Sequence, residues 1–406
     1  MTRLALSAAS LARGPTWGAV GDELLAVPGR AWAQYRSGNG RPWDLRAAGH
    51  LYRRLAMGGR WSELTNAVIA GPQQTINRLL APEGEVAAFN REYDGFEAAV
   101  TASDSAAADP LREWWLRRLL ETPHPLLERM TLFWHNHFAV SASHVGKARL
   151  LRQYLAMLRK HALGKLPELL DAAVKDPALA TSRDAAQRSL PRPTAATERA
   201  IREATAPAVV VRKLYRWFIS ELDAPSETLL QPLTDELSRT GDIGGVVRTM
   251  ASSELFFSAA AYRRRAKNPV EYAISILRPL ACVVSTQQLG RDLDALGQDL
   301  CRPPTLDGWP EGAAWLTPSL LVGRSNLAAA LLAGKEPYGN KVDVQAAASN
   351  SGSRSGTAAS RWLLDLWLQG DVPPPVLEAL RPRSGDDDAL RRFAHGLVTL
   401  PEFQLS

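Results

Sequence analysis

The sequence predicts an all-α protein: an irregular multi-helix domain with long loops and a short helical tail. Three observations predict this fold class. Apolar residues recur with the 3.6-residue period of an α-helix along most of the chain. Alternating runs of β-branched residues are scarce, so we expect strands to hold less than about a tenth of the residues. Prolines and capping residues precede several of the apolar stretches, where helices begin.

The length of the chain indicates more than one simple hydrophobic core. Its 406 residues exceed the usual limit for a single core, so we expect two subdomains or one elaborated helical domain. The pattern along the chain suggests four regions. They are an N-terminal extension over 1–49, a main helical domain over 50–333, a flexible linker or loop over 334–360 and a C-terminal helical tail over 361–406.

Helical periodicity is clearest in ten segments, in addition to the histidine-rich one discussed below. These segments are Leu111–Leu120, Lys147–Leu163, Leu166–Val174, Ala208–Leu222, Glu227–Arg239, Val246–Ser252, Val270–Val284, Pro318–Leu332, Ser360–Leu368 and Pro375–Leu380. Three polar or small-residue segments interrupt the pattern, at 101–109, 182–197 and 334–360. The last of them buries little apolar area to offset an ordering cost of roughly 1–2 kcal/mol per residue. We therefore expect it to be mobile, or ordered only by a partner.

The most unusual segment is Phe-Trp-His-Asn-His-Phe at 133–138, which holds two of the seven histidines. The apolar pattern over 126–140, opened by Pro123 and Pro125, predicts a helix. On that helix His137 lies in the middle of the apolar stripe, whereas His135 points away from it.

Two interpretations of these histidines stay open. In the structural one, His137 is a hydrogen-bonded core histidine and His135 contacts another helix. We then expect His137→Ala to cost roughly 2–4 kcal/mol, and His135→Ala to cost less unless His135 reaches a second helix or a ligand. In the functional one, the segment forms a polar site, with His135 and His137 as candidate metal ligands. An unbroken helix would prevent the two imidazoles from converging on one ion, whereas a strand would place both on one face. His144 could join such a site only through a loop that folds back.

Two further clusters have structural explanations. Asn268, Pro269 and Glu271 have the spacing of a capping box at the start of a helix. The segment 302–315 contains three prolines and two glycines, so it predicts a stiff, irregular loop that holds Trp309 and Trp315. Such a loop is either a lid on the core or the wall of a binding pocket.

Charge and cysteine content limit the function classes. The net charge of +6 is spread along the chain, and its densest cluster is Arg263–Arg265 with Lys267. Because basic residues alternate with acids along helix faces, we expect a solvated surface and no nucleic-acid binding. Two cysteines exclude a disulfide scaffold or a cysteine zinc cluster, and they fit either a reducing compartment or a protein that is indifferent to redox conditions.

The chain shows no feature that assigns it to a membrane. No apolar run approaches the ~18 residues of a membrane span. The first residues resemble a signal peptide only faintly, because their apolar stretch is short and is interrupted by Ser7. We expect a cytoplasmic protein without a membrane span, although export stays open.

Several motifs in order resemble the bacterial family called domain of unknown function 1800. They are His50-Leu51-Tyr52-Arg53-Arg54, Phe133–Phe138, the Arg152–Gly164 helix, Lys213–Phe218, Lys267–Glu271 with Arg278, the Pro303–Trp315 loop and Arg324-Ser325-Asn326. They span most of residues 50–332, whereas the residues before 50 and after about 335 match less well.

The resemblance implies a largely helical protein without an assigned reaction or cofactor. Members are often encoded beside a second uncharacterised family, number 1501, which resembles the alkaline phosphatase and sulfatase superfamily, so a protein of that family is the implied partner. Typical members also carry an acidic segment after the helix that ends near residue 180. Here that segment is missing or is reduced to 198–203. If its carboxylates are catalytic in the wider family, this chain binds rather than catalyses.

Two functions of different classes follow. The first is an accessory or scaffold component that acts with another protein. The alternative is an enzyme with a histidine-based, metal-dependent polar pocket, because imidazole acts as an acid, a base or a metal ligand near neutral pH. The candidate pocket residues are His50, His135, Asn136, His137, Glu271 and Arg278. The sequence does not decide whether the protein is an enzyme.

Overall fold

The predicted all-α class is confirmed. The structure is a computed structural model that describes residues 20–38, 41–82, 84, 86–100, 108–186, 195–380 and 388–406. These residues form helices α1 to α24 and one 3-10 helix, η2, joined by irregular segments with isolated β-bridges and no β-strand.

All ten predicted helical segments overlap helices of the structure, and the histidine-rich segment lies on an eleventh. These helices are α7 (Asp109–Glu121), α8 (Pro125–Phe138), α10 (Ala148–His161), α11 (Leu166–Lys175), α14 (Pro207–Phe218), α15 (Glu227–Thr240), α16 (Ile243–Ala251), α17 (Pro269–Leu277), α19 (Pro318–Leu332), α21 (Gly356–Leu368) and α22 (Pro374–Ala379). Proline in the first turn and capping side chains explain why many of them begin where they do. For example, the side chain of Thr317 accepts a hydrogen bond from the backbone N–H of Leu320 at the start of α19.

The remaining helices lie outside these predicted segments. They are α1 (Val20–Ala26), α2 (Pro28–Ala31), α3 (Leu45–Ala56), α4 (Trp61–Ala70), α5 (Pro72–Leu80), α6 (Val86–Val100), α9 (Ala142–Val145), α12 (Pro177–Ala186), α13 (Ala195–Ala204), α18 (Thr286–Ala295), α20 (Val344–Asn350), α23 (Ala389–Thr399), α24 (Pro401–Gln404) and η2 (Gly312–Leu316). Several are short, so they offer few turns in which a 3.6-residue period can be recognised.

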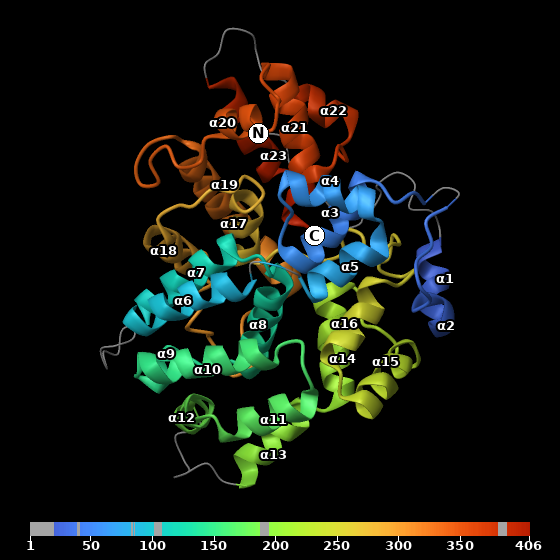
Figure 1. The fold of residues 1–406 in the computed structure, drawn as a ribbon, viewed down its shortest axis with the longest axis vertical. Helices are drawn as coiled ribbons and strands as arrows, with labels where there is room; N and C mark the ends of the chain where they lie inside the picture. Colours follow the sequence, from blue (N-terminus) through green and yellow to red (C-terminus); the bar gives the residue numbers. More distant parts are fainter. Residues whose placement is uncertain are drawn as a thin grey trace.

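Helices α8 and α17 occupy the middle of the molecule. Figure 1 shows α8 at the centre, with α19 to α23 at one end and α11 to α13 at the other. Helix α8 packs against α3, α5, α7 and α10, and α17 packs against α7 and α19. Every residue of α17 is buried. Helices from distant parts of the sequence therefore meet around a shared interior.

The segment 334–360 contains more regular structure than a linker. Helix α20 lies within it and α21 begins at Gly356. Tyr338, Val342 and Val344 are buried. Whether this segment is mobile in solution stays a prediction. Of the other two interrupting segments, 101–107 and 187–194 lie outside the described residues.

Residues 404–406 pack against the segment that precedes α17. The backbone N–H of Lys267 donates to the carbonyl oxygen of Gln404 at 2.9 Å, and the N–H of Ser406 donates to the carbonyl oxygen of Arg265 at 2.8 Å. The guanidinium of Arg324 donates both to the side chain of Gln404 and to the carbonyl oxygen of Lys267. These hydrogen bonds hold in place the backbone segment that carries Arg265 and Lys267.

Candidate functional site

A buried cluster of charges begins at the first turn of α17. The side chain of Asn268 accepts a hydrogen bond from the backbone N–H of Glu271 at 2.9 Å, which confirms the predicted N-cap. The other half of the predicted capping box, in which the side chain of Glu271 would accept the backbone N–H of Asn268, is wrong. The carboxylate of Glu271 instead binds the guanidinium groups of Arg129, at 3.0 Å, and Arg265. It takes these partners because two buried arginines need a compensating charge more than the backbone N–H at the start of the helix does.

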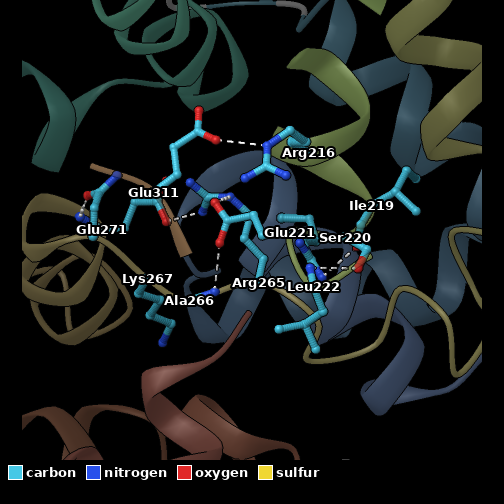
Figure 2. A network of polar contacts seen from close by, with 12 residues as sticks. Arg216, Ile219, Ser220, Glu221, Leu222, Arg265, Ala266, Lys267, Glu271 and Glu311 are labelled. Carbon is cyan, nitrogen blue, oxygen red and sulfur yellow. Dashed lines mark hydrogen bonds and ion pairs between the residues drawn. The ribbon is translucent and has the colours of Figure 1, made fainter. Parts of the chain in front are cut away.

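Arg265 joins this pair to a second carboxylate. Figure 2 shows Arg265 between Glu271 and Glu221. Its Nε lies 3.3 Å from Oε1 of Glu221, whose Oε2 accepts the backbone N–H of Ala266 at 3.1 Å. The guanidinium of Arg265 also lies 4.4 Å from the ring centroid of Trp217, a cation–π contact.

A third arginine, Arg54 of α3, is fully buried nearby. Its Nη2 donates to the carbonyl oxygens of Ile219 and Ala261. Burial lowers the pKa of Arg54 well below its ordinary value, and the charge of Arg265 lowers it further. The network therefore holds three arginines and two glutamates that come from four separate parts of the sequence.

The pKa values of the two glutamates are shifted in opposite directions. Burial alone would raise the pKa of Glu271, but Arg129 and Arg265 together hold it below its ordinary value. Burial raises the pKa of Glu221 above its ordinary value, and Arg265 only partly opposes this. Removing one member of such a network leaves an uncompensated buried charge, which typically costs about 3–5 kcal/mol.

These contacts overturn the expected solvated surface at 263–267. Arg265 and Lys267 are each only 2 % exposed. The ammonium of Lys267 donates to the hydroxyl of Ser275 and lies 3.6 Å from the ring centroid of Phe403. Sequence alternation was misleading here because Arg265 is balanced by Glu221, which is distant in sequence, and by Glu271 within the next helix, and not by an acid on its own helix face.

A small pocket lies beside the charged network. Its volume is about 10 Å³, which is close to the room that one water molecule needs. Glu221 and Arg265 line it together with Leu132, Asn136, Trp217, Asn268, Gln298, Trp309, Pro310, Glu311 and Trp315. In Figure 2 the carboxylate of Glu311 turns toward Arg216, with which it forms an ion pair at 2.8 Å. As it stands, the pocket admits a water molecule but not an organic substrate.

The predicted tryptophan loop forms one wall of this pocket. Trp309 and Trp315 are each 4 % exposed, so the loop both covers the core and lines the pocket. The side-chain oxygen of Asn136 accepts the backbone N–H of Trp309 at 2.8 Å and thereby holds the loop against α8. The preceding residue, Gly308, has φ +92°, and a Cβ there would lie 2.5 Å from the backbone oxygen of Asn136. Glycine is therefore required for this close approach.

His135 and His137 lie in different surroundings on α8. Nε2 of His135 lies 2.5 Å from the carbonyl oxygen of Leu300, and its Nδ1 lies 3.4 Å from the hydroxyl of Tyr154 on α10. His137 is 5 % exposed and packs against aromatic rings of its own helix, including Phe133. Both of its ring nitrogens lack a hydrogen-bond partner among the described residues. The predicted burial of His137 is confirmed, whereas the described residues offer no partner for its predicted hydrogen bond.

The other candidate residues are not gathered at one point. His50, on α3, lies 2.9 Å from the carbonyl oxygen of Phe256 through its Nε2. Arg278 forms a two-pronged ion pair with Glu63 at 2.6 and 2.9 Å. Of the six predicted pocket residues, Asn136 lines the small pocket and Glu271 binds Arg265 beside it.

Burial determines the protonation state of the three central histidines. It lowers the pKa of His135 to about 4 and those of His50 and His137 well below the ordinary value. All three rings are therefore neutral near pH 7. In the part of the chain that the structure describes, no group of three or more His, Cys, Asp and Glu side chains has an arrangement that could hold a metal ion.

Several members of the charged network were not identified from the sequence. Arg54 and Arg129 lie within helical segments whose pattern assigns them no partner, and Glu221 lies in an irregular segment after α14. The one available signal was local: Arg129 stands three residues after Leu126 and four before Phe133, on a helix predicted to carry an apolar stripe. A buried arginine needs a carboxylate, but the sequence does not indicate which one.

Comparison with known proteins identifies the family. The family model described as "Protein of unknown function (DUF1800)" matches residues 50–193 and 194–405. The chain belongs to this family. The match continues through the C-terminal helices, further than the motifs between residues 50 and 332. No curated protein and no solved structure matches the chain.

The length and apolar character of the helices bear on membrane insertion. Within the described ranges, none combines the length and the apolar character that a bilayer span requires.

Proposed function

We propose that this member of the DUF1800 family is an accessory or scaffold component that acts with another protein. One observation carries the proposal: the central carboxylates are used in internal ion pairs. Glu271 binds two arginines and Glu221 binds one, beside a pocket that has room for about one water molecule. Groups arranged in this way stabilise the positions of α3, α8 and α17 relative to one another.

The histidines support the same proposal. A catalytic imidazole works together with a second reactive group in open space. His50 and His135 are instead engaged with backbone carbonyl oxygens of different segments. The missing acidic segment adds to this argument, because its carboxylates would be the most obvious acid and base groups if the wider family catalyses a reaction.

The proposed partner is a protein of family 1501, which the resemblance associates with this family. The test is sedimentation velocity on a mixture of this protein and the family 1501 protein encoded beside it, each also measured alone. A shared, faster-sedimenting species is the expected result, and an unrelated phosphatase of similar size serves as the control. Independent sedimentation of the two proteins at about 10 µM each would contradict a partnership of micromolar affinity or tighter.

The alternative proposal, a histidine-based enzyme that depends on a metal, has a direct test. Protein purified without an affinity tag is analysed for metals by mass spectrometry. The accessory proposal predicts far less than one metal ion per chain. Stoichiometric iron, zinc or copper would reverse the preference, and His135→Ala and His137→Ala variants would then show which imidazole holds the ion.

We place this function in the cytoplasm and expect no nucleic-acid partner. Both cysteines are free, with Cys301 buried and Cys282 partly buried, which suits a reducing compartment. The burial of Arg265 and Lys267 removes two of the four residues of the densest basic cluster from the surface available to nucleic acid. Cell fractionation with an antibody against the chain tests the compartment.

A further inference from the structure

A surface groove lies beside α1 and α2, at one edge of the molecule (Figure 1). Its volume is about 320 Å³, and it is lined by Leu24, Arg30, Ala33, Gln34, Arg36, Arg41 and Glu254. Three of these residues are arginines and only one is acidic. All of them except Glu254 precede residue 50, where the match to the family model begins. The groove is therefore built mostly by a part of the chain that the family model does not cover.

Backbone hydrogen bonds join Glu254 to the N-terminal residues of the groove. The N–H of Glu254 donates to the carbonyl oxygen of Ala33 at 2.8 Å, and the N–H of Tyr35 donates to the carbonyl oxygen of Ser252 at 2.8 Å. The side chain of Tyr35 is buried. Segments that are distant in sequence are thereby held side by side, so the lining of the groove is preformed.

Glu254 balances one of the three arginines. Its carboxylate forms an ion pair with Arg41 and also accepts the backbone N–H of Arg36 at 3.3 Å. The guanidinium of Arg41 lies 5.8 Å from the ring centroid of Tyr35, a cation–π contact. Arg41 and Glu254 therefore form a neutral pair whose position is fixed by the buried tyrosine and by the backbone.

Arg30 and Arg36 have no carboxylate within the groove. Arg36 is exposed, and no ion pair involves its guanidinium in the part of the chain that the structure describes. Arg30 forms an ion pair with Glu23 at 3.6 Å, but both side chains are more than half exposed, and exposed pairs contribute little free energy. Glu23 does not line the groove. The groove thus carries two positive charges that no lining residue balances.

We propose that this groove binds a small organic ligand that carries two acidic groups. Guanidinium groups bind carboxylates and phosphates through paired, charge-assisted hydrogen bonds, and one acidic group of the ligand meets each of Arg30 and Arg36. The volume of the groove is at the lower end of the range typical of small-molecule sites, roughly 300–1,000 Å³, which suits a compact ligand. This inference goes beyond the accessory role and does not depend on it, because no residue of the charged network around Glu271 lines the groove.

The test is isothermal titration of the full chain with three ligands at constant ionic strength. Succinate carries two carboxylates, glycerate 3-phosphate carries a carboxylate and a phosphate, and propionate carries a single carboxylate. One ligand per chain is expected, and the better of the two diacids should bind at least about tenfold more tightly than propionate, because it makes a second charge-assisted contact. Tighter binding of succinate assigns the site to a dicarboxylate, and tighter binding of glycerate 3-phosphate assigns it to a phosphorylated acid. Both results support the site.

Substitutions in the groove should change the affinity in opposite directions. Arg30→Gln and Arg36→Gln should each weaken binding of the better diacid at least about tenfold, and both arginines are exposed, so the variants should fold like the parent. Glu254→Gln should tighten binding, because it removes the carboxylate from the groove and frees Arg41. No binding of either diacid up to about 10 mM, or equal affinity for the diacids and propionate, would overturn the proposal.

Arg239→Gln is the matched control. Arg239 is exposed and lines a different groove, together with Asp235 and Glu236. Its substitution changes the net charge of the chain by the same amount as Arg36→Gln but leaves the proposed site intact, so this variant should bind the diacid like the parent. Equal weakening by Arg239→Gln and Arg36→Gln would show that the ligand responds only to net charge, which would contradict a site in this groove.

Discussion

At the scale of single residues, His135 contacts another helix as expected, and it also has the buried hydrogen bond that the sequence assigned to His137. The helical stripe correctly placed His137 in the core, but no partner for its nitrogens follows from the stripe. His135 faces away from the stripe and is nevertheless buried, because α10 and the segment at Leu300 cover it. Periodicity predicts which face a residue occupies but not what packs against that face.

The ranking of the two alanine variants therefore reverses. His135→Ala removes a buried ring and leaves the carbonyl oxygen of Leu300 without its partner, so we expect a loss of about 3–4 kcal/mol in the free energy of unfolding. His137→Ala removes only the ring, and we expect a smaller loss of about 2–3 kcal/mol. Urea unfolding of both variants measures the difference. A more stable His135→Ala than His137→Ala would contradict these contacts.

Stability should also depend on pH through His135. Its folded-state pKa is about 4, against an ordinary value of 6.5. Above pH 6.5 the ring is neutral in both states, so the full stability is present. As the pH falls from 6.5 to 4, the unfolded chain binds a proton that the folded chain excludes, and stability falls by roughly 3 kcal/mol for this group.

The measurement is the free energy of unfolding across that pH range for the parent and for His135→Gln. The variant should lose less stability on acidification than the parent. The control is His144→Gln, because His144 is exposed and should leave the parent's pH dependence unchanged. Identical slopes for the parent and His135→Gln would show that His135 is not held neutral by burial.

At the scale of elements, the tryptophan loop depends on one glycine. Gly308→Ala combines a strained backbone at φ +92° with a collision against Asn136, so we expect it to cost about 2–4 kcal/mol. The matched control is Gly146→Ala, at φ +65° with no atom within 4 Å of the added Cβ. It should cost only about 1–2 kcal/mol, from backbone strain. Equal losses in urea unfolding would mean that the loop does not lie against α8.

The segment 334–360 allows a second test at this scale. Helix α20 is short, and the turn that follows it holds the exposed Arg354. Short elements with little buried area open locally at low free-energy cost. Limited trypsin digestion of the isolated chain should therefore cut within this segment first, and Edman sequencing of the fragments locates the cut. First cleavage elsewhere, with 334–360 resistant, would contradict the expected mobility.

The sequence predicted elements better than contacts, and α17 shows why. Its start was recognised because Asn268, Pro269 and Glu271 are neighbours whose spacing follows from helix geometry. The final partners of Glu271 are Arg129 and Arg265, and the first of these is far away in the sequence. No local pattern encodes that pairing, since it arises only when α8 and α17 pack together. For the same reason the tryptophan loop was predicted, but the pocket it lines was not.

At the scale of the whole molecule, the central claim is that buried charges join parts of the chain that are distant in sequence. Arg54, Arg129, Glu221, Arg265 and Glu271 replace what would otherwise be an apolar centre. Buried ion pairs are expensive to form, and their best-supported role is to specify one arrangement of elements among several. The fold then depends on long-range electrostatic matching as well as on helix packing.

A double-mutant cycle between Arg129 and Glu271 tests this claim most directly. Arg129→Met, Glu271→Gln and the double variant are compared with the parent by urea unfolding. Each single change should cost about 3–5 kcal/mol, and the double change should cost at least about 2 kcal/mol less than their sum, because neither charge is then left alone. The exposed pair Arg216 and Glu311 is the control, with an expected coupling of less than about 1 kcal/mol. Additive losses within about 0.5 kcal/mol for Arg129 and Glu271 would contradict the claim.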